Sequence, residues 1–310
     1  MMIGIPRERQ DGENRVAIIP SGVSTLLEAG YEVVVESGAG SAAHFTDDDY
    51  RHAGAIIADN ADALYRQATV ILKVRAPSSE EARLIQQDAT LICLLDPWFN
   101  QPLLEQLAGQ NVQAFALDLV PRTTRAQSMD VLSAMAGISG YRAVLSGAMA
   151  LPRYFPMLMT AAGTIHPARV LVIGAGVAGL MAIATARRLG AVVEAYDLRP
   201  EVKEQVESLG ASFLELTFES DESGETAGGY AKIMSKEFID AEMALFADQA
   251  REVDIIVTTA LIPGKKAPLI IKEHMISIIP YLLDSKEKIK CQLTLKKGNS
   301  YNLKQLQRSI

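Results

Sequence analysis

The sequence predicts an α/β protein built from two parallel-sheet domains that a long helix joins. Three observations carry this prediction. Short apolar runs alternate with helix-like segments over the first 120 residues, the same alternation starts again at Arg169, and a long apolar stretch of helical character lies between them. Strands that alternate with helices favour a parallel sheet covered by helices on both faces. At 310 residues the chain is long enough for two such domains, each with its own core.

The first domain is expected to span residues 1–127. Its strands are predicted where short apolar runs occur, at residues 2–5, 31–35, 69–74, 90–95 and 112–119. Helices are predicted between them at residues 23–28, 61–68 and 103–107. The first of these helices ends before Gly30, and glycine is frequent just after a last helical turn.

A linking helix and a connection are expected over residues 128–165, and the second domain over residues 166–283. The helix runs from Ser128 to about Leu151 and is interrupted by Gly137 and Gly140. Strands of the second domain are predicted at residues 170–173, 192–196, 213–216 and 254–258. Ligands of such sheets bind beyond the carboxyl ends of the strands, so a cleft between the two domains is the expected site.

Charge, cysteines and the first residues narrow the class of protein. A net charge of −7 argues against a general nucleic-acid binder. The two cysteines, Cys93 and Cys291, lie far apart and match no metal-ligand spacing, which indicates a reducing compartment and no metal site. No apolar signal-peptide core follows Met1, so a cytoplasmic location is expected.

One uncharged run of 17 residues, from Val170 to Ala186, approaches the length of a membrane span. Its glycines, Gly174, Gly176 and Gly179, are instead typical of a buried strand that turns tightly into a buried helix. We therefore expect no membrane span in this chain.

The same run contains the pattern G-x-G-x-x-G, in which each glycine has a physical role. The three permit a tight turn, a close approach of the backbone to a pyrophosphate, and close packing of the helix on the strand. The helix N-terminus then offers N–H groups to the phosphates. Asp197 ends the next strand, 18 residues after Gly179, where an acid binds the ribose hydroxyls. The pattern predicts dinucleotide binding; an ordinary strand–helix turn with an accidental acid is the alternative.

Asp197 also bears on the choice between NAD and NADP. Arg199 lies two residues later and is a candidate ligand for the 2′-phosphate of NADP. A carboxylate at the end of that strand would repel the phosphate, so NAD is expected. A second glycine-rich segment, residues 38–43, lacks a comparably placed acid and is interpreted as a turn.

Several short motifs make the chain similar to a known family. GIPRE at residues 4–8, NRVA at 14–17, VESGAG at 35–40 and LKV at 72–74 resemble the alanine dehydrogenase/pyridine nucleotide transhydrogenase superfamily. Within it, PRTTRAQSMD at 121–130 and TTALIPGK at 258–265 resemble the alpha subunits of proton-translocating NAD(P) transhydrogenases. The resemblance covers about residues 1–268 and agrees with two Rossmann-like parallel-sheet domains joined by a long helix.

The resemblance implies a function within a complex. Such a subunit binds NAD(H), forms a homodimer and passes hydride to or from NADP on a partner beta subunit, while membrane parts couple the transfer to proton translocation. It implies a place at the cytoplasmic face of the inner membrane, reached through partner subunits. The residue chemistry agrees, because hydride exchange between two nicotinamides moves no O–H or N–H proton and needs orientation rather than a base. None of the chain's four histidines lies in a motif loop.

The resemblance also assigns site residues. It places Arg122, Gln127 and Asp130 at the nicotinamide end of NAD, with Ser133 close by. Thr124 and Gln127 also fit a capping box, which is the alternative interpretation of these residues. The resemblance and the glycine motif together give the residues expected to bind NAD: Arg122, Thr123, Thr124, Arg125, Gly174, Gly176, Val177, Gly179, Asp197, Leu198, Arg199, Gly229, Tyr230, Thr259 and Ala260.

Gly229 and Tyr230 belong to a segment, residues 217–235, that is rich in acids, glycine, serine and threonine. Such a composition is typical of a surface loop that costs little to keep mobile. By resemblance, this segment folds over bound NAD with Tyr230. An insertion without that role is the alternative.

Arg15 and Lys73 match positions that bind pyruvate in alanine dehydrogenases, in which a catalytic histidine follows the strand corresponding to residues 90–95. Here Asp96, and no histidine, comes after that strand. We therefore expect Arg15 and Lys73 to form ion pairs within the domain. A soluble alanine or amino-acid dehydrogenase and a non-catalytic NAD-binding remnant are the alternative functions.

The pattern changes near the C-terminal end. Residues 281–310 hold seven basic and two acidic side chains, a local charge of +5, and residues 284–310 match nothing in the family. A truncation or a frameshift would produce such a change. We therefore expect a non-family basic tail at 284–310, no closing strands from about residue 275 onward, and an incomplete second domain.

Overall fold

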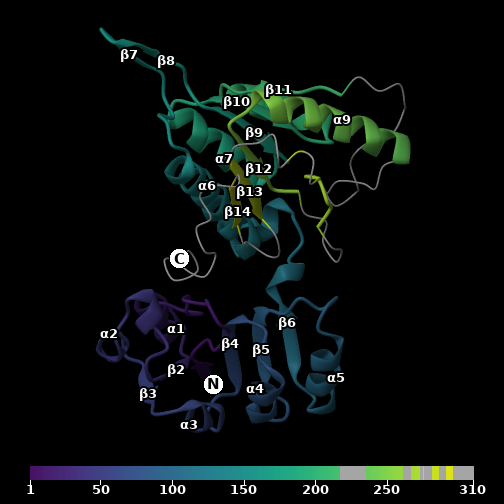
Figure 1. The fold of residues 1–310 in the computed structure, drawn as a ribbon. Coiled ribbons are helices and arrows are strands. Elements are labelled where there is room, and N and C mark those ends of the chain that lie inside the picture. The colour runs from purple at the N-terminus through teal and green to yellow at the C-terminus, as the bar shows by residue number, and fades with distance from the viewer. Residues whose placement is uncertain (217–234, 261–266, 273–274, 276–280, 286–290, 296–310) are drawn as a thin grey trace. The chain divides into compact units, whose positions relative to one another are not determined.

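A computed structural model of the chain describes residues 1–216, 235–260, 267–272, 275, 281–285 and 291–295. The chain divides into two compact units, of which the first holds Met1–Val131 and the second begins at Leu132. Each unit has its own six-stranded sheet (Figure 1). The predicted α/β class with parallel sheets is confirmed in both.

The strands of unit 1 are all parallel and lie in the order β3-β2-β1-β4-β5-β6. They are β1 (Met2–Ile5), β2 (Glu32–Glu36), β3 (Ile56–Ala58), β4 (Val70–Arg75), β5 (Thr90–Leu94) and β6 (Gln113–Ala116). The helices of this unit are α1 (Pro20–Glu28), α2 (Asp47–His52), α3 (Ala61–Tyr65), α4 (Ser79–Leu84) and α5 (Gln101–Gly109). Short 3-10 turns are η1 (Ser41–Ala43), η2 (Leu117–Leu119) and η3 (Thr124–Met129).

Both faces of this sheet are buried. In β2, Val33 and Val35 belong to one buried apolar cluster and Val34 to another. Successive side chains of a strand point to opposite faces, so each face carries a core of its own. This burial on two sides explains why the strands were recognisable as apolar runs rather than as alternating patterns.

Unit 2 repeats this plan in the order β11-β10-β9-β12-β13-β14, and every pair is parallel except β13 with β14. Its strands are β9 (Arg169–Ile173), β10 (Val192–Tyr196), β11 (Ser212–Phe213), β12 (Ile255–Thr258), β13 (Tyr281–Ser285) and β14 (Cys291–Leu295). Its helices are α6 (Val131–Ala150), whose first residue belongs to unit 1, α7 (Val177–Arg188), α8 (Lys203–Ser208) and α9 (Lys236–Glu252), with the 3-10 turn η4 (Pro200–Val202).

Apolar clusters again occupy both faces of the unit 2 sheet. Val172 of β9 packs with residues of α6 and α7, including Ile183. Ile256 of β12 belongs to a different cluster, which Phe246 of α9 joins. The ring of Phe246 stands edge-on to that of Tyr196, with centroids 5.1 Å apart.

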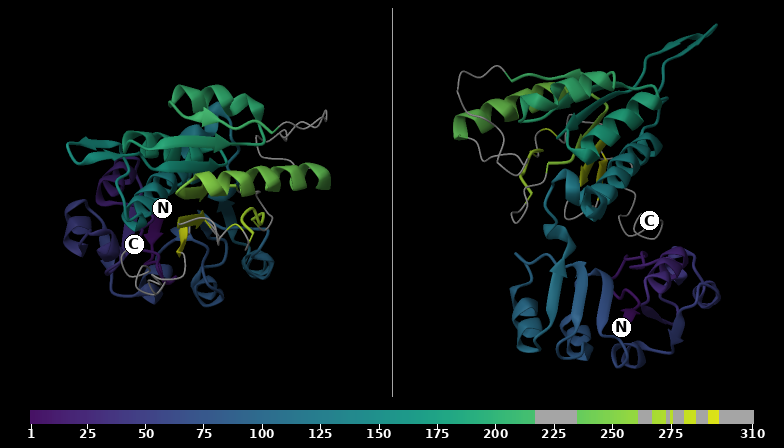
Figure 2. Two further views of the ribbon diagram at one scale, coloured as in Figure 1. Left: turned by 45° about the horizontal axis from the view of Figure 1, so that its top comes forward. Right: turned by 180° about the vertical axis from the view of Figure 1, so that it is seen from behind.

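A two-stranded antiparallel hairpin, β7 (Leu158–Thr160) and β8 (Gly163–Ile165), projects from unit 2 (Figures 1 and 2). Its base is anchored by Arg153, which pairs with Asp254 at 3.1 Å. The same guanidinium donates to the carbonyl oxygen of His166 at 2.9 Å. No helix among the described residues is both long and apolar enough to cross a membrane.

Two predicted strands are shorter than expected. Residues 117–119 form η2 instead of extending β6, because the Asp118 carboxylate accepts the N–H groups of Leu95 and Asp96, both at 2.7 Å. The strand predicted at 213–216 pairs with β10 only over Ser212–Phe213.

The expectation that no closing strands form from about residue 275 onward is wrong. β13 continues the parallel sheet beside β12, and β14 returns antiparallel beside β13. All the basic side chains of residues 281–310 lie outside these two five-residue strands. The excess of charge, averaged over the whole segment, concealed short runs that contain strand-forming tyrosine, leucine and threonine.

Candidate functional site

The glycine-rich turn after β9 combines two packed glycines with an open one. Gly174 has a φ of 97°, a left-handed conformation that favours glycine. A Cβ atom on Gly179 would lie 1.7 Å from the carbonyl oxygen of Gly174, so α7 approaches the turn as closely as the backbone allows. A Cβ atom on Gly176 would meet nothing within 4 Å. The open space therefore lies at the residue from which the helix starts.

Thr259, immediately after β12, holds this turn in place. Its N–H donates to the carbonyl of Ile173 at 2.8 Å, and its hydroxyl donates to the carbonyl of Gly174 at 2.9 Å. A Cβ atom on Gly174 would lie 2.6 Å from the Thr259 hydroxyl oxygen. Thr259 therefore fixes the position of the glycine-rich turn. Ala260 follows Thr259 along the same edge of the sheet.

The first turn of α7 provides a site for an anion. Gly176 stands at the N-cap and Val177 is the first helical residue, 44% exposed. The first N–H groups of a helix have no acceptor within the helix, and the helix dipole makes this end positive. No acidic residue lies in the first turn. The arrangement suits a phosphate or pyrophosphate.

Asp197 follows β10 beside this turn and accepts hydrogen bonds from two directions. Its Oδ2 accepts the N–H of Ala175 at 2.7 Å, which ties the acid to the glycine-rich turn. Its Oδ1 accepts the N–H and the Nε of Arg199, both at 2.9 Å. Leu198, between them, packs against the cluster that contains Tyr196.

These groups lie at one edge of the sheet because their strands are neighbours. β9 lies between β10 and β12, and Ile173 pairs in register with Tyr196 and with Thr258. The sheet order reverses at this point, which is where doubly wound sheets bind their ligands. The structure therefore brings together nine predicted residues in unit 2: Gly174, Gly176, Val177, Gly179, Asp197, Leu198, Arg199, Thr259 and Ala260.

The residues predicted at the nicotinamide end belong to another region of the chain. Six of the predicted residues belong to unit 1. Asp130 is half-buried, and the others are exposed: Arg122, Thr123, Thr124, Arg125 and Gln127. η3 is anchored by Ala126, which is buried. Thr123, rather than Thr124, is the N-cap of this turn and makes no side-chain capping bond, so the capping-box interpretation is wrong.

Ser133 lies in the first turn of α6, in unit 2. Gly229 and Tyr230 lie outside the described residues.

Two contributors to the site were missed. Gly140, expected only to interrupt a helix, is a very close contact of α6 with α7: a Cβ atom there would lie 2.0 Å from the carbonyl oxygen of Ala178. Glycine within an apolar helix is the signal that could have indicated this close packing. The Ala175 N–H, which holds Asp197, is a backbone group and leaves no signal in the sequence.

A second group of charged side chains lies at the corresponding edge of unit 1. The Lys73 ammonium, almost fully buried, lies 3.4 Å from Glu8 and 3.0 Å from Glu81. Arg15 forms a two-pronged pair with Glu13, at 2.7 and 2.6 Å. The predicted ion pairs of Arg15 and Lys73 within the domain are therefore confirmed.

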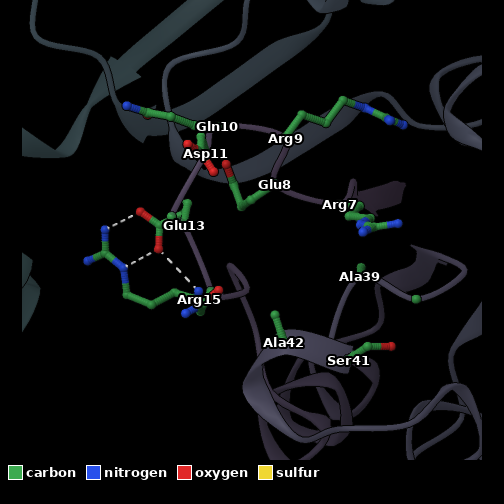
Figure 3. Close-up of a pocket in the computed structure, with 13 residues that line it drawn as sticks. Arg7, Glu8, Arg9, Gln10, Asp11, Glu13, Arg15, Ala39, Ser41 and Ala42 are labelled. Atoms are coloured by element: carbon green, nitrogen blue, oxygen red, sulfur yellow. Dashed lines mark hydrogen bonds and ion pairs between the residues drawn. The ribbon is translucent and has the colours of Figure 1, made fainter. Parts of the chain in front are cut away.

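The loops after β1 and β2 line an open cavity of about 460 Å³ on this side of unit 1, and Glu13 faces Arg15 in it (Figure 3). Burial raises the pKa of Glu13, but hydrogen bonds from Arg15 and from Arg75 outweigh burial and lower this pKa to about 2. The carboxylate is thus ionised at neutral pH. The described residues contain no cluster of three metal-ligating side chains.

Two family models together match most of the chain. The model of "Alanine dehydrogenase/PNT, N-terminal domain" matches residues 4–139, and that of "Alanine dehydrogenase/PNT, C-terminal domain" matches residues 143–280.

Named relatives and a solved structure agree with these matches. An NAD(P) transhydrogenase alpha-subunit chain of Rhodospirillum rubrum is 50% identical over 282 residues, which is 89% of this chain and 73% of that protein. The "NAD(P) transhydrogenase subunit alpha" of Haemophilus influenzae is 49% identical, over 89% of this chain and 53% of its own length. The crystal structure of the transhydrogenase from Sinorhizobium meliloti superposes with a TM-score of 0.78 at 42% identity, covering 90% of this chain and 75% of that one.

Proposed function

The chain belongs to the alanine dehydrogenase/PNT family, and from this premise we propose that it is the NAD(H)-binding alpha component of a proton-translocating NAD(P) transhydrogenase. In this role it exchanges hydride with NADP(H), the second substrate, on a partner beta subunit. The similarity to transhydrogenase alpha subunits supports the partner. Proton translocation and a place at the cytoplasmic face of the inner membrane belong to the same proposal.

One observation carries NAD(H) binding: the turn after β9, the acid after β10 and the threonine after β12 meet at one edge of the sheet. The residues fit a dinucleotide. Gly176 leaves open space at the positive end of α7 for the pyrophosphate, and Asp197 is an acceptor for ribose hydroxyls. When bound, NAD supplies the nicotinamide ring that takes or gives the hydride. The protein holds and orients it.

In this proposal Arg122, Gln127, Asp130 and Ser133 orient the nicotinamide. Hydride transfer between two nicotinamides needs the reacting carbons at the correct distance and angle, and no acid or base. The polar side chains of residues 122–130 are exposed or half-buried, so a bound nucleotide can reach them. Thr123, Thr124 and Arg125 are proposed to contact the same nucleotide, and Gly229 with Tyr230 to close over it.

Two features argue against the alternative function, an amino-acid dehydrogenase. Arg15 and Lys73, which match the pyruvate-binding positions of such enzymes, are each engaged by carboxylates of their own domain. The loop after β5 carries Asp96 and the exposed Trp98 in place of a histidine. Both features favour the transhydrogenase function over oxidation of alanine.

We further propose that the chain forms a homodimer through the β7–β8 hairpin. An isolated two-stranded hairpin is marginally stable in water. Residues 156–165 carry no charge, and Met157 and Met159 are 57% and 70% exposed. A projecting, uncharged arm with its base clamped by Arg153 suits a symmetric contact with a second copy (Figure 2).

Isothermal titration of the purified chain with NADH and with NADPH tests the proposed function. We expect saturable NADH binding and NADPH binding weaker by at least about tenfold, because a carboxylate at the ribose disfavours a 2′-phosphate. Equal affinities for the two nucleotides, or no NADH binding, would overturn the proposal.

A further inference from the structure

The Asp197 carboxylate has no acceptor position left over in this structure. Oδ1 accepts the N–H and the Nε of Arg199, both at 2.9 Å. Oδ2 accepts the N–H of Ala175 at 2.7 Å and the Nη2 of Arg199 at 3.1 Å. An ionised carboxylate offers about four lone-pair sites, so these four donors saturate it.

Of the four donors to Asp197, two are fixed in the backbone and two belong to a side chain that can move. The N–H groups of Ala175 and Arg199 belong to the backbone, which the glycine-rich turn and the end of β10 hold in place. The Nε and Nη2 atoms belong to a side chain that can rotate away. The two hydroxyls of a ribose need two acceptor positions on the Asp197 carboxylate. The guanidinium occupies the two positions that become available when its side chain rotates away.

The pair between Arg199 and Asp197 is more than a surface contact. The side chains are only 18% and 7% exposed, so solvent screens the interaction weakly. The guanidinium approaches with two parallel N–H groups, the geometry that makes arginine–carboxylate pairs strong and directional. A lysine in the same place would offer a point charge without this fork.

We propose that Arg199 is an internal ligand of the ribose site: its guanidinium fills the Asp197 carboxylate until the ribose hydroxyls of NAD(H) displace it. This inference rests on the proposed NAD(H)-binding function. It makes Arg199 a determinant of specificity rather than a simple contact. Only a ligand that donates two hydrogen bonds to Asp197 replaces what the guanidinium loses.

The same arrangement explains how an arginine beside the ribose can coexist with a preference for NAD. A 2′-phosphate donates nothing to Asp197 and is repelled by it, so it cannot release the guanidinium from the carboxylate. Arg199 therefore does not bind the 2′-phosphate of NADP(H) as long as Asp197 is charged. Neutralising Asp197 removes the charge that repels the 2′-phosphate and weakens the pair with the guanidinium, which can then act as a cationic partner of the phosphate.

The test measures the dissociation constants of NADH and NADPH by isothermal titration for a set of variants of the whole chain. Arg199→Lys keeps the charge and removes the fork. Asp197→Asn removes the carboxylate charge, and the double variant Asp197→Asn with Arg199→Gln removes both. Arg169→Lys is the matched control, because Arg169 begins β9, at the end away from the glycine-rich turn, and pairs with Glu194 of β10 at 3.2 Å.

We expect Arg199→Lys to bind NADH about three- to tenfold more tightly, since a competing charge-assisted pair is weakened, and Arg169→Lys to bind it like the unaltered chain. We expect Asp197→Asn to gain affinity for NADPH and the double variant to lose that gain. Circular dichroism confirms that each variant is folded.

The outcomes separate the two proposals. If the unaltered chain binds no NADH, the proposed function fails. If it binds NADH but Arg199→Lys binds no more tightly, or if the double variant keeps the NADPH gain, the proposed function stands and the internal ligand is refuted.

Discussion

The hydroxyl of Thr259 donates to the carbonyl of Gly174 at 2.9 Å, although the two residues are 85 positions apart in the chain. The contact joins the end of β12 to the turn after β9. It turns the Gly174 carbonyl toward β12, so that the turn keeps one conformation before any nucleotide binds. A site that is already shaped loses less conformational entropy on binding.

Thr259→Val should weaken NADH binding without unfolding the chain. Valine keeps the shape and removes the hydroxyl, at a cost of about 1 kcal/mol, or about fivefold in affinity. The measurement is the dissociation constant by isothermal titration. Thr185→Val is the control, because the Thr185 hydroxyl donates to a carbonyl within α7, that of Met181, at 2.7 Å. Equal losses in both variants would contradict the role of Thr259.

Alanine substitutions should separate the packing glycines from the open one. Gly179→Ala places a Cβ atom 1.7 Å from a backbone oxygen, so we expect a fall in melting temperature of at least about 5 °C, from about 2–3 kcal/mol of overpacking. Gly176→Ala meets nothing within 4 Å and has a backbone conformation that alanine accepts, with φ of −77°.

The Gly176→Ala chain should therefore keep its melting temperature and lose about tenfold or more in NADH affinity, since its methyl group enters the space for the pyrophosphate. Differential scanning calorimetry and titration together check the pair. A Gly176→Ala variant with unchanged NADH affinity would show that the pyrophosphate lies elsewhere.

Glu242 of α9 should make stability depend on pH. Burial raises the pKa of Glu242 from 4.5 to about 7, and a hydrogen bond with Tyr196 only partly offsets this. Between these two values the folded chain holds a proton that the unfolded chain has lost, so stability falls as pH rises from about 4.5 to 7.

Glu242→Gln should therefore raise the melting temperature at pH 8 and leave it nearly unchanged at pH 4.5. Thermal unfolding at both values measures the difference. A variant that is equally stabilised at both would show that Glu242 is already ionised in the folded chain over this range.

The hairpin should carry the contact between two copies. Met159→Asp, at the 70%-exposed residue of β7, should convert a dimer into a monomer because a charge in an apolar contact has to be desolvated. Light scattering after size-exclusion chromatography measures the mass. Ile239→Asp, at a 41%-exposed position of α9, should leave the dimer intact. A Met159→Asp chain that stays dimeric would place the interface on another surface.

The features of the site that could be predicted from the sequence are those in which spacing alone dictates geometry. A strand, three glycines and an acid at the next strand end place Gly174, Gly176, Gly179 and Asp197 together, because each neighbour lies within one strand–helix–strand unit. The contact that Thr259 makes could not be predicted, since its partner is set by which strand lies beside β9. The saturation of Asp197 by a guanidinium depends on a side-chain conformation.

The helices and strands likewise divide into those that could be predicted from the sequence and those that could not. Strands buried on both faces, such as β9, were evident as apolar runs. α9 was not predicted, although Met243, Phe246 and Ala250 follow helical spacing and are buried. β13 and β14 were not predicted because five-residue strands between clusters of lysines are hidden when charge is averaged over the segment.

In the proposed function this chain holds NAD(H) and exchanges hydride with NADP(H) on another protein. The most direct measurement follows hydride transfer from NADH to a spectrally distinct NADP⁺ analogue, with and without the NADP-binding partner subunit. We expect transfer only when both proteins are present. We also expect Gln127→Asn to slow it by about 10- to 100-fold with NADH affinity unchanged, because small errors in orientation are costly. No transfer in the presence of the partner and bound NADH would contradict the proposed function, and an unchanged rate with Gln127→Asn would contradict the role of Gln127 in orienting the nicotinamide.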